Sequence, residues 1–266
     1  DTVTINSGIL VTVTVNAACA SIVFTTGTTG ITASITINSG ILLAVSGNVT
    51  ITLPGSGNFN DITVGAGTLT VGGTLALSGT TAGSRTTNLN ISTGTVTVTG
   101  AITSAGGASQ IIFSGAGTLN AGGAAGILSG TLGTFTASTG TVNFNGSVLQ
   151  TPALTYTYNI FKVNNTTGVT LGAVATITTL TIGDGTANSV FSDGAYAIST
   201  ATTLNLTSGT YNCAVTGASA FPWGTANISS GTTVNYNTTG AQTIAAKNYA
   251  NLTVSGSRGS NSVTLA

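Results

Sequence analysis

Apolar and polar residues alternate along most of this chain, in short runs. In the segments 11–15, 68–71 and 95–99, every second side chain is Val or Leu. A period of two places apolar side chains on one face of a β-strand. Between the runs stand Asn-Ser-Gly, Gly-Ala-Gly and Asp-Gly, whose residues suit tight turns. The pattern predicts an all-β chain with strands of about five residues, separated by turns every 8 to 12 residues or so.

Two segments of the chain recur. The heptapeptide Thr-Ile-Asn-Ser-Gly-Ile-Leu occurs at residues 4–10 and again, letter for letter, at 36–42. A longer unit, with a Thr-Val-Asn strand, a Gln-Thr pair and a strand beginning at Tyr, occupies residues 140–163 and recurs at 233–254. Short strands repeated in this way bury their apolar side chains only by stacking on their neighbours, with Thr and Asn ladders outside.

The repeats predict a parallel β-solenoid. At about 20 to 25 residues per coil, the chain makes about 11–13 coils. The alternative is two tandem β-sandwich modules, which the same turn spacing allows. The Gly/Ala-rich segment 120–130 is the best candidate for a joint. It divides the chain into an N-terminal half, 1–130, and a C-terminal half, 131–266, unless the two form one continuous solenoid.

The longer repeated unit resembles the β-strand-rich repeats of adhesin-like surface proteins from Bacteroidota and related bacteria. The resemblance covers about residues 140–174 and 231–266, including the strands Thr-Val-Asn-Phe-Asn and Tyr-Ala-Asn-Leu-Thr-Val. It implies a right-handed β-solenoid or a string of β modules on an exported fibre, residence at the cell surface or in the extracellular space, and an adhesive or structural role. It carries no catalytic residue to this chain.

Composition removes several function classes. The chain has 4 Lys plus Arg, 4 Asp plus Glu, no His and a net charge of zero. Nucleic acid is an improbable partner for such a chain, because binding phosphate backbones requires clustered cations. The mean hydropathy is +0.47, yet apolar runs reach only about five residues, and a membrane helix needs about 20. We expect a folded protein that does not span a membrane as a helix.

Few residues here could carry chemistry. Asp184 and Asp193, each followed by Gly, are the two acidic residues closest in sequence; we interpret both as turn residues, with a weak calcium site as the alternative. Lys162 and Lys247 both lie in the repeated unit, where they suggest charges that protect edge strands; a covalent cross-link to an Asn or Asp side chain is the alternative. Without His, a hydroxyl nucleophile lacks an activating base. We therefore predict no enzyme, no catalytic residue, no cofactor and no metal.

Cys19 and Cys213 lie too far apart in a linear solenoid to form a disulfide within the chain. We interpret each as a small buried residue, with a disulfide between subunits as the alternative. Trp223, the single Trp, is predicted to be a core or end-capping residue rather than a sugar-binding platform. Asn-x-Ser/Thr sequons, which make glycosylation plausible, occur at Asn48, Asn90, Asn145, Asn164, Asn165, Asn205, Asn227, Asn237 and Asn251.

These observations predict a structural subunit or segment of an extracellular filament or adhesin. Its terminal strands, at residues 2–15 and 263–266, would offer free edges to further copies of the chain. The alternative function is a surface module that binds glycans, or binds ice through Thr-x-Thr stripes such as Thr95, Thr97 and Thr99.

Overall fold

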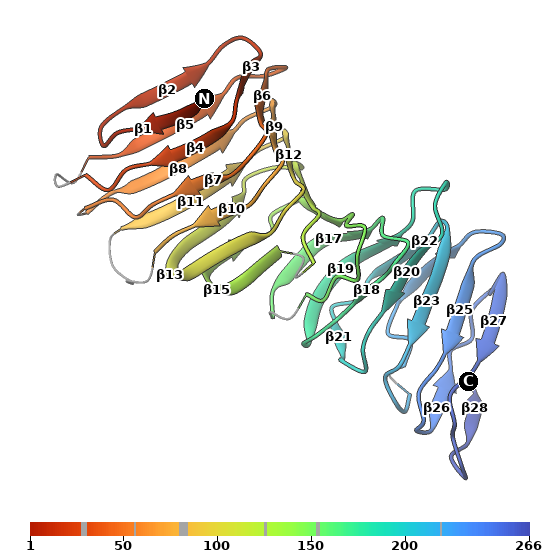
Figure 1. The fold of residues 1–266 in the computed structure, drawn as a ribbon. Coiled ribbons are helices and arrows are strands. Elements are labelled where there is room, and N and C mark those ends of the chain that lie inside the picture. Colours follow the sequence, from red (N-terminus) through yellow and green to blue (C-terminus); the bar gives the residue numbers. More distant parts are fainter. Residues whose placement is uncertain (28–30, 56, 80–84, 125–126, 153–154, 219) are drawn as a thin grey trace. The chain divides into compact units, whose positions relative to one another are not determined.

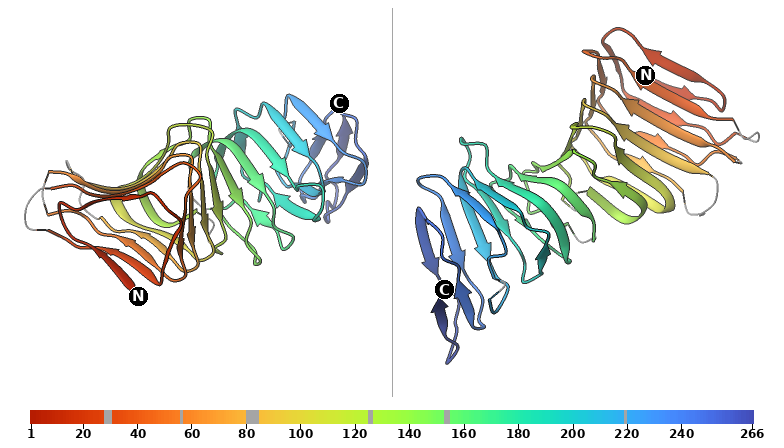
Figure 2. Two further views of the ribbon diagram at one scale, coloured as in Figure 1. Left: turned by 90° about the horizontal axis from the view of Figure 1, so that it is seen from above. Right: turned by 180° about the vertical axis from the view of Figure 1, so that it is seen from behind.

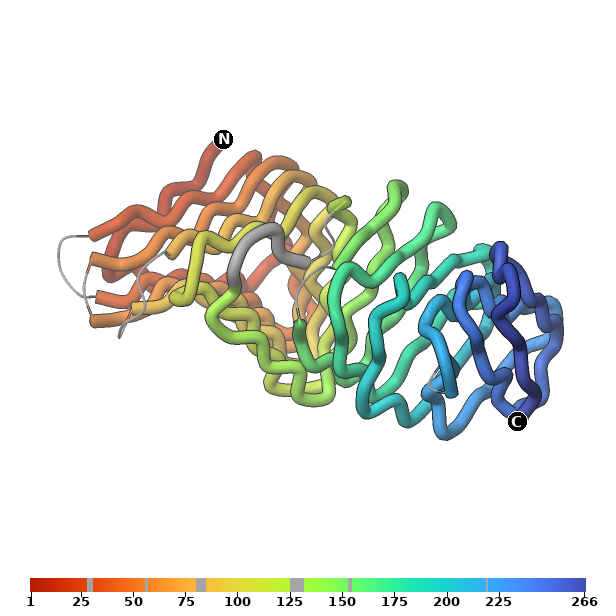
Figure 3. The backbone as a smooth tube through the Cα atoms, turned by 90° about the horizontal axis from the view of Figure 1, so that it is seen from below, coloured from red at the N-terminus to blue at the C-terminus, as the bar shows by residue number. Residues whose placement is uncertain are grey.

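The computed structural model is an all-β parallel β-solenoid of about 11 turns (Figure 1). It describes residues 1–27, 31–55, 57–79, 85–124, 127–152, 155–218 and 220–266, without the side chains of 127–131. Within each compact part of the chain, successive turns lie against one another (Figure 3). The strand pairs of the described residues, for example β1 (Thr2–Ile5) with β4 (Ser21–Phe24), are parallel. Parallel stacking confirms the predicted solenoid, and the alternative of two β-sandwiches is wrong because their sheets are antiparallel.

The chain forms two compact units, residues 1–142 and 143–266. The division follows Val142, whereas composition suggested one after residue 130. Most of the Gly/Ala-rich segment proposed as the joint lies in unit 1, next to the strand β14 (Thr118–Ala121), and its residues 125 and 126 lie outside the described residues. The strand β16 (Thr141–Phe144) spans the boundary.

Unit 1 has three faces, and its first turns are three-sided when seen from above (Figure 2). Each face is a column of stacked strands. The first face contains β1, β4, β7 (Val49–Ile51) and β10 (Leu75–Leu77); the second contains β2 (Leu10–Val13), β5 (Ala33–Ile37), β8 (Phe59–Val64) and β11 (Thr86–Ile91); the third contains β3 (Ala17–Cys19), β6 (Leu42–Val45), β9 (Thr68–Val71), β12 (Thr95–Val98) and β14. The first two faces merge at β13 (Ile102–Phe113), which pairs with both β10 and β11 and then with β15 (Ile127–Thr136).

Unit 2 is also built from columns of parallel strands. One column contains β17 (Thr157–Val163), β19 (Ala175–Ile182), β22 (Thr203–Leu206) and β24 (Thr225–Ile228), with β21 (Ile198–Ser199) also on β19; a second contains β18 (Val169–Thr170), β20 (Ser189–Ser192), β23 (Gly209–Cys213), β25 (Thr233–Tyr236) and β27 (Asn251–Val254); β26 (Gln242–Ile244) pairs with β28 (Val263–Leu265). The register gives turns near the predicted coil length, some shorter and some longer: in unit 1, Phe59 pairs with Thr86, 27 residues on. Thr157 pairs with Thr176 and Thr210 with Thr233, which gives turns of 19 and 23 residues.

Alternation along each strand decides which side chains enter the core. In β12, Val96 and Val98 are fully buried, while Thr95 and Thr97 face outward. Outward side chains stack in register from turn to turn, as predicted. The Asn227 side-chain amide donates to Asn205 Oδ1 at 2.8 Å, and that of Asn235 donates to Asn212 Oδ1 at 3.1 Å. The strands therefore form because a period of two fits a surface that is buried on one side.

The cores of the two units differ in composition. Unit 1 stacks aliphatic columns, such as Ile22, Val49, Leu75 and Ile102, which are in register and at most 1% exposed. Unit 2 instead contains a chain of aromatic rings with neighbouring centroids 4.4 to 6.1 Å apart: Phe144, Phe161, Phe191, Tyr211, Phe221 and Tyr249. These separations are those of stacked and edge-to-face ring pairs.

The repeated heptapeptide marks a corner of the solenoid rather than a complete turn. Its first copy joins β1 to β2, and its second joins β5 to β6, so the copies lie at different corners. In each copy the residue after Gly donates its N–H to the Asn carbonyl, at 3.1 and 3.2 Å. Gly8 and Gly40 have φ angles of +83° and +71°, a region that is unfavourable for L-residues but not for glycine. The same letters recur because the same β-turn recurs.

Gly40→Ala is expected to lower the free energy of unfolding by about 1 kcal/mol, because a positive φ strains the backbone of alanine but not that of glycine. No other group lies within 4 Å of the position of the new Cβ, so the backbone angle alone sets the cost. Gly65→Ala is the matched control: its φ is not positive, its Cβ would meet Ile37 O at an ordinary 3.6 Å, and it should be nearly neutral. Urea denaturation of both variants tests this, and equal losses would contradict it.

Candidate functional site

The N-terminal turn has an uncovered edge on each of its three strands. Strand β1 pairs only with β4, β2 only with β5, and β3 only with β6. The backbone N–H and C=O groups along the opposite edge of each strand have no neighbouring strand among the described residues. Such an edge can accept a strand from another polypeptide.

The apolar core is exposed at this turn. Val3 lies in register with Ile22 and points the same way, yet Val3 is 40% exposed and Ile22 only 1%. A cavity of about 190 Å³ opens there, with an almost wholly apolar lining that includes Val3, Val11, Val13 and Cys19. One more stacked turn would bury these side chains, as the following turns bury Ile22.

The N-terminal turn has little to prevent edge pairing. Natural edge strands are protected by Lys, Pro, bulges or inward-pointing charges. Asp1 is the single charged residue among residues 1–60, and the sequence of β1, β2 and β3 contains no Pro. The paired residues of β1 and β2 keep a continuous register with their neighbours. The edge is therefore flat, uncharged and open.

The last turn of unit 2 is exposed in a similar way. Strand β27 pairs only with β25, and all four of its residues are exposed. Leu252 and Val254 lie in register with the buried residues Val234 and Tyr236, but they are 42% and 45% exposed. Leu265 in β28 is 75% exposed. Here too, side chains of the core columns face solvent.

Arg258 holds the last turn together. Its guanidinium donates to the carbonyl oxygens of Tyr236 at 2.7 Å and Gly240 at 2.8 Å, and to Gln242 Oε1 at 2.7 Å. Gln242 in turn donates to the carbonyl of Cys213 at 2.8 Å. Arg258 was not among the residues that the sequence pattern singled out, although its partner Gln242 recurs as Gln150 in the repeated unit.

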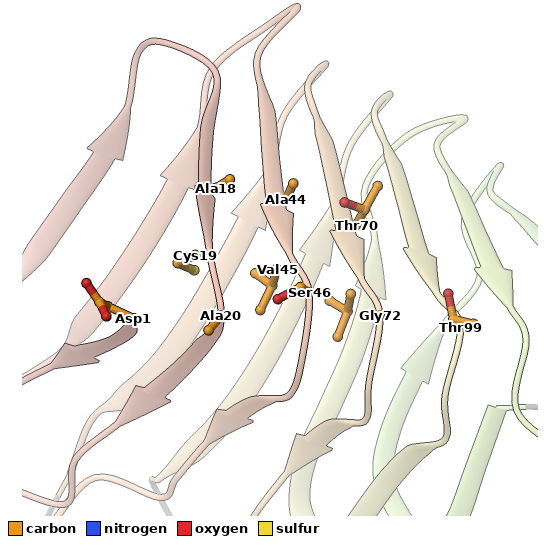
Figure 4. Close-up of a pocket in the computed structure, with 11 residues that line it drawn as sticks. Asp1, Ala18, Cys19, Ala20, Ala44, Val45, Ser46, Thr70, Gly72 and Thr99 are labelled. Atoms are coloured by element: carbon orange, nitrogen blue, oxygen red, sulfur yellow. The ribbon is translucent and has the colours of Figure 1, made fainter.

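A lateral groove of about 590 Å³ runs across β3, β6 and β9 (Figure 4). The residues that line it have small or short side chains. They are Asp1, Ala18, Cys19, Ala20, Ala44, Val45, Ser46, Thr70, Val71, Gly72 and Thr99. Close packing explains why position 72 is a glycine, since a Cβ on Gly72 would lie 2.3 Å from Ser46 O. With one carboxylate and no aromatic ring, this groove has neither an acid–base pair nor a stacking platform for sugars.

The structure places Asp193 in a buried polar cluster of unit 2. The side chain is 1% exposed, and its Oδ1 accepts the N–H groups of Ala214 at 2.8 Å and Ala195 at 3.1 Å. Burial raises the pKa of Asp193 to about 6, against the lowering effect of these backbone bonds. Tyr211 and Trp223 border the cluster.

Asp184 is a turn residue, as predicted. Its Oδ1 accepts hydrogen bonds from Thr186 Oγ1 at 2.7 Å and Thr186 N at 3.0 Å, which lower the pKa of Asp184 to about 2. Asp193 also starts a turn, at Gly194 with φ +61°, but its burial was not foreseen. In the described part of the chain no three His, Cys, Asp or Glu residues are grouped so that they could hold a metal.

The edge-strand role expected of the two lysines is wrong. Lys162 lies on β17, an interior strand of its sheet, and Lys247 lies in the loop between β26 and β27. The Lys247 ammonium donates to Gly224 O at 2.7 Å.

Among the sequons, Asn165 is fully buried and donates to Val148 O, so the folded chain cannot carry a glycan there.

Both cysteines are free. Cys213 is fully buried in β23, as predicted, whereas Cys19 in β3 is partly exposed and borders both the cavity and the groove. Trp223 is a core residue, 2% exposed. Within the described residues, no helix has the length and apolar character to cross a membrane.

Comparison with protein-family models, curated proteins and solved structures finds no match to this chain.

Proposed function

We propose that this chain is a non-enzymatic structural subunit or segment of an exported filament or adhesin at the cell surface, and that copies associate through their terminal turns. The open edge of the N-terminal turn carries the proposal. Three strand edges without protecting charges lie beside an apolar cavity, and the strands of the last turn are exposed in the same way. Export and surface residence rest on the resemblance of the repeated unit to bacterial surface repeats.

The composition supports a mechanical role. Stacked backbone hydrogen bonds and buried aliphatic or aromatic columns stiffen each unit, while a net charge of zero lets identical subunits approach without repulsion. No second function is proposed. Glycan or ice binding stays a prediction: Thr68 and Thr70 lie in register with Thr95 and Thr97, but this array extends over two turns only before Asn120 replaces the second threonine.

Val3→Lys is expected to weaken self-association by about 100-fold or more. Val3 points into the core at the free end, where a lysine can reach solvent, but a stacked copy would bury the ammonium without a partner at a cost of about 3 kcal/mol or more. Sedimentation velocity or light scattering over a concentration series measures the effect, and electron microscopy shows whether the assemblies are filaments.

Thr50→Lys is the matched control, because Thr50 points outward between two buried residues of β7. It adds the same charge and should leave association unchanged. A second measurement needs no substitution. The alkylation of Cys19 under native conditions should slow as the protein concentration rises, while Cys213, being fully buried, should not react at any concentration. A chain that stays monomeric, with a constant alkylation rate of Cys19, would contradict the proposed function.

A further inference from the structure

Strand direction gives the two ends of the chain different roles. The described strand pairs in both terminal turns are parallel. When the N-terminal turn of one copy meets the last turn of another, the new strand pairs continue this parallel stacking. When two N-terminal turns meet, a two-fold axis relates them and the new pairs are antiparallel. The geometry that exists inside the molecule is therefore extended only by a head-to-tail contact.

Two basic side chains gather at one end. Lys247 and Arg258 are the charged residues after Asp193, whereas the N-terminal turn carries one charged side chain, Asp1. Two last turns would therefore bring like charges together, and a contact between unlike ends would not.

The apolar surfaces of the two ends also differ in shape. The N-terminal turn has a cavity of about 190 Å³, with an opening among short side chains such as Ala17, Ala18 and Val3. The last turn presents larger side chains that lie above buried core positions, with Leu252 and Leu265 exposed by 42% and 75%. A cavity at one end and exposed leucines at the other suit contact between unlike ends.

We infer that the assembly is polar: the N-terminal turn of each copy receives the last turn of a second copy, whose leucines fill the apolar cavity. This inference rests on the proposed function, because it specifies the partner of the same terminal turns. A heterologous contact of this kind gives an open-ended filament unless its rotation closes a ring.

Cross-linking between single cysteines tests the polarity. Thr4 in β1 and Thr264 in β28 are exposed on strands of the two terminal turns. Thr4→Cys and Thr264→Cys are each made in a Cys19→Ser background, and the fully buried Cys213 is retained. Each variant is treated with a flexible bis-maleimide, alone and as an equimolar mixture. The expected result is a cross-linked dimer in the mixture, and at least tenfold less in either variant alone.

The double variant, which carries both substitutions in one chain, should give a ladder of dimers, trimers and longer products. Light scattering on each unmodified variant separates the two proposals. Association with dimers from Thr4→Cys alone would overturn the polarity but leave association through the terminal turns in place. Association without any cross-link would overturn the inference and place the contact elsewhere. Monomers at every concentration would overturn the proposed function and leave the terminal turns to another stretch of polypeptide.

Discussion

Phe161→Ala is expected to lower the free energy of unfolding by about 3 to 5 kcal/mol. Phe161 is fully buried in the aromatic chain of unit 2. Its ring centroid lies 4.4 Å from that of Phe144, 5.0 Å from that of Tyr158 and 5.8 Å from that of Phe191. Truncation removes three ring contacts and leaves a cavity that stacked strands on both sides cannot close. Urea denaturation measures the loss.

Phe59→Ala is the control for the chemistry of the substitution. Phe59 lies at the start of β8 in unit 1 and is 42% exposed, so its truncation should cost about 1 kcal/mol or less. Phe161→Leu should fall between the two, because leucine fills part of the space. Losses of equal size for Phe161→Ala and Phe59→Ala would show that the aromatic chain does not stabilise unit 2.

Asp193→Asn is expected to stabilise the protein by about 3 kcal/mol at pH 8, which is large for a single substitution. Burial raises the pKa of Asp193 from 3.8 to about 6, so the ionised carboxylate destabilises the folded chain at pH 8. Asparagine keeps an Oδ1 that can accept the N–H groups of Ala214 and Ala195, and it removes the charge. Its new amide group would occupy the position of Oδ2, in the cluster that Tyr211 borders.

The pH dependence gives the sign of the effect. Between pH 4 and pH 6 or so, the folded state holds the Asp193 proton more tightly than the unfolded state does, so stability falls as the pH rises through this window. The advantage of Asp193→Asn should therefore appear across the window and vanish near pH 4. Urea denaturation of both proteins at several pH values measures it. A destabilised variant at pH 8 would contradict the assignment.

Asp184→Asn serves as a control with the opposite sign. The exposed Asp184 carboxylate accepts bonds from Thr186, and its pKa is lowered to about 2. Its favourable contribution is present above the unfolded pKa of 3.8 and is lost as the pH falls towards 2. The substitution should thus bring no gain at pH 8.

The fold followed from the sequence because alternation and turn residues are local signals. Val96 and Val98 enter the core as the period of two requires, and Gly40 adopts the positive φ that the Asn-Ser-Gly turn predicts. The merging of two faces along β13 was not foreseen. It depends on the absence of a corner between Ile102 and Phe113, in a segment where Gly106 and Gly107 resemble the turn residues of other corners.

The candidate site could be predicted only in outline. The free edges at the terminal strands follow from the repeat pattern, but the cavity beside Val3 depends on how three faces meet. The sequence also could not separate Asp184 from Asp193, since both precede Gly in similar contexts. Burial separates them: one lies on the surface, and the other lies beneath the backbone of the next turn, where Ala214 binds it. Such a difference depends on contacts between residues about 20 positions apart.

The aromatic chain of unit 2 has a spectroscopic consequence. All six tyrosines and the single tryptophan follow residue 142, and unit 1 has only phenylalanine. Near-ultraviolet absorption and intrinsic fluorescence therefore come almost entirely from unit 2, whereas backbone circular dichroism records both units. An unfolding curve from fluorescence reports on unit 2 alone. Its difference from the dichroism curve of the same sample isolates the unfolding of unit 1, without any label or truncation.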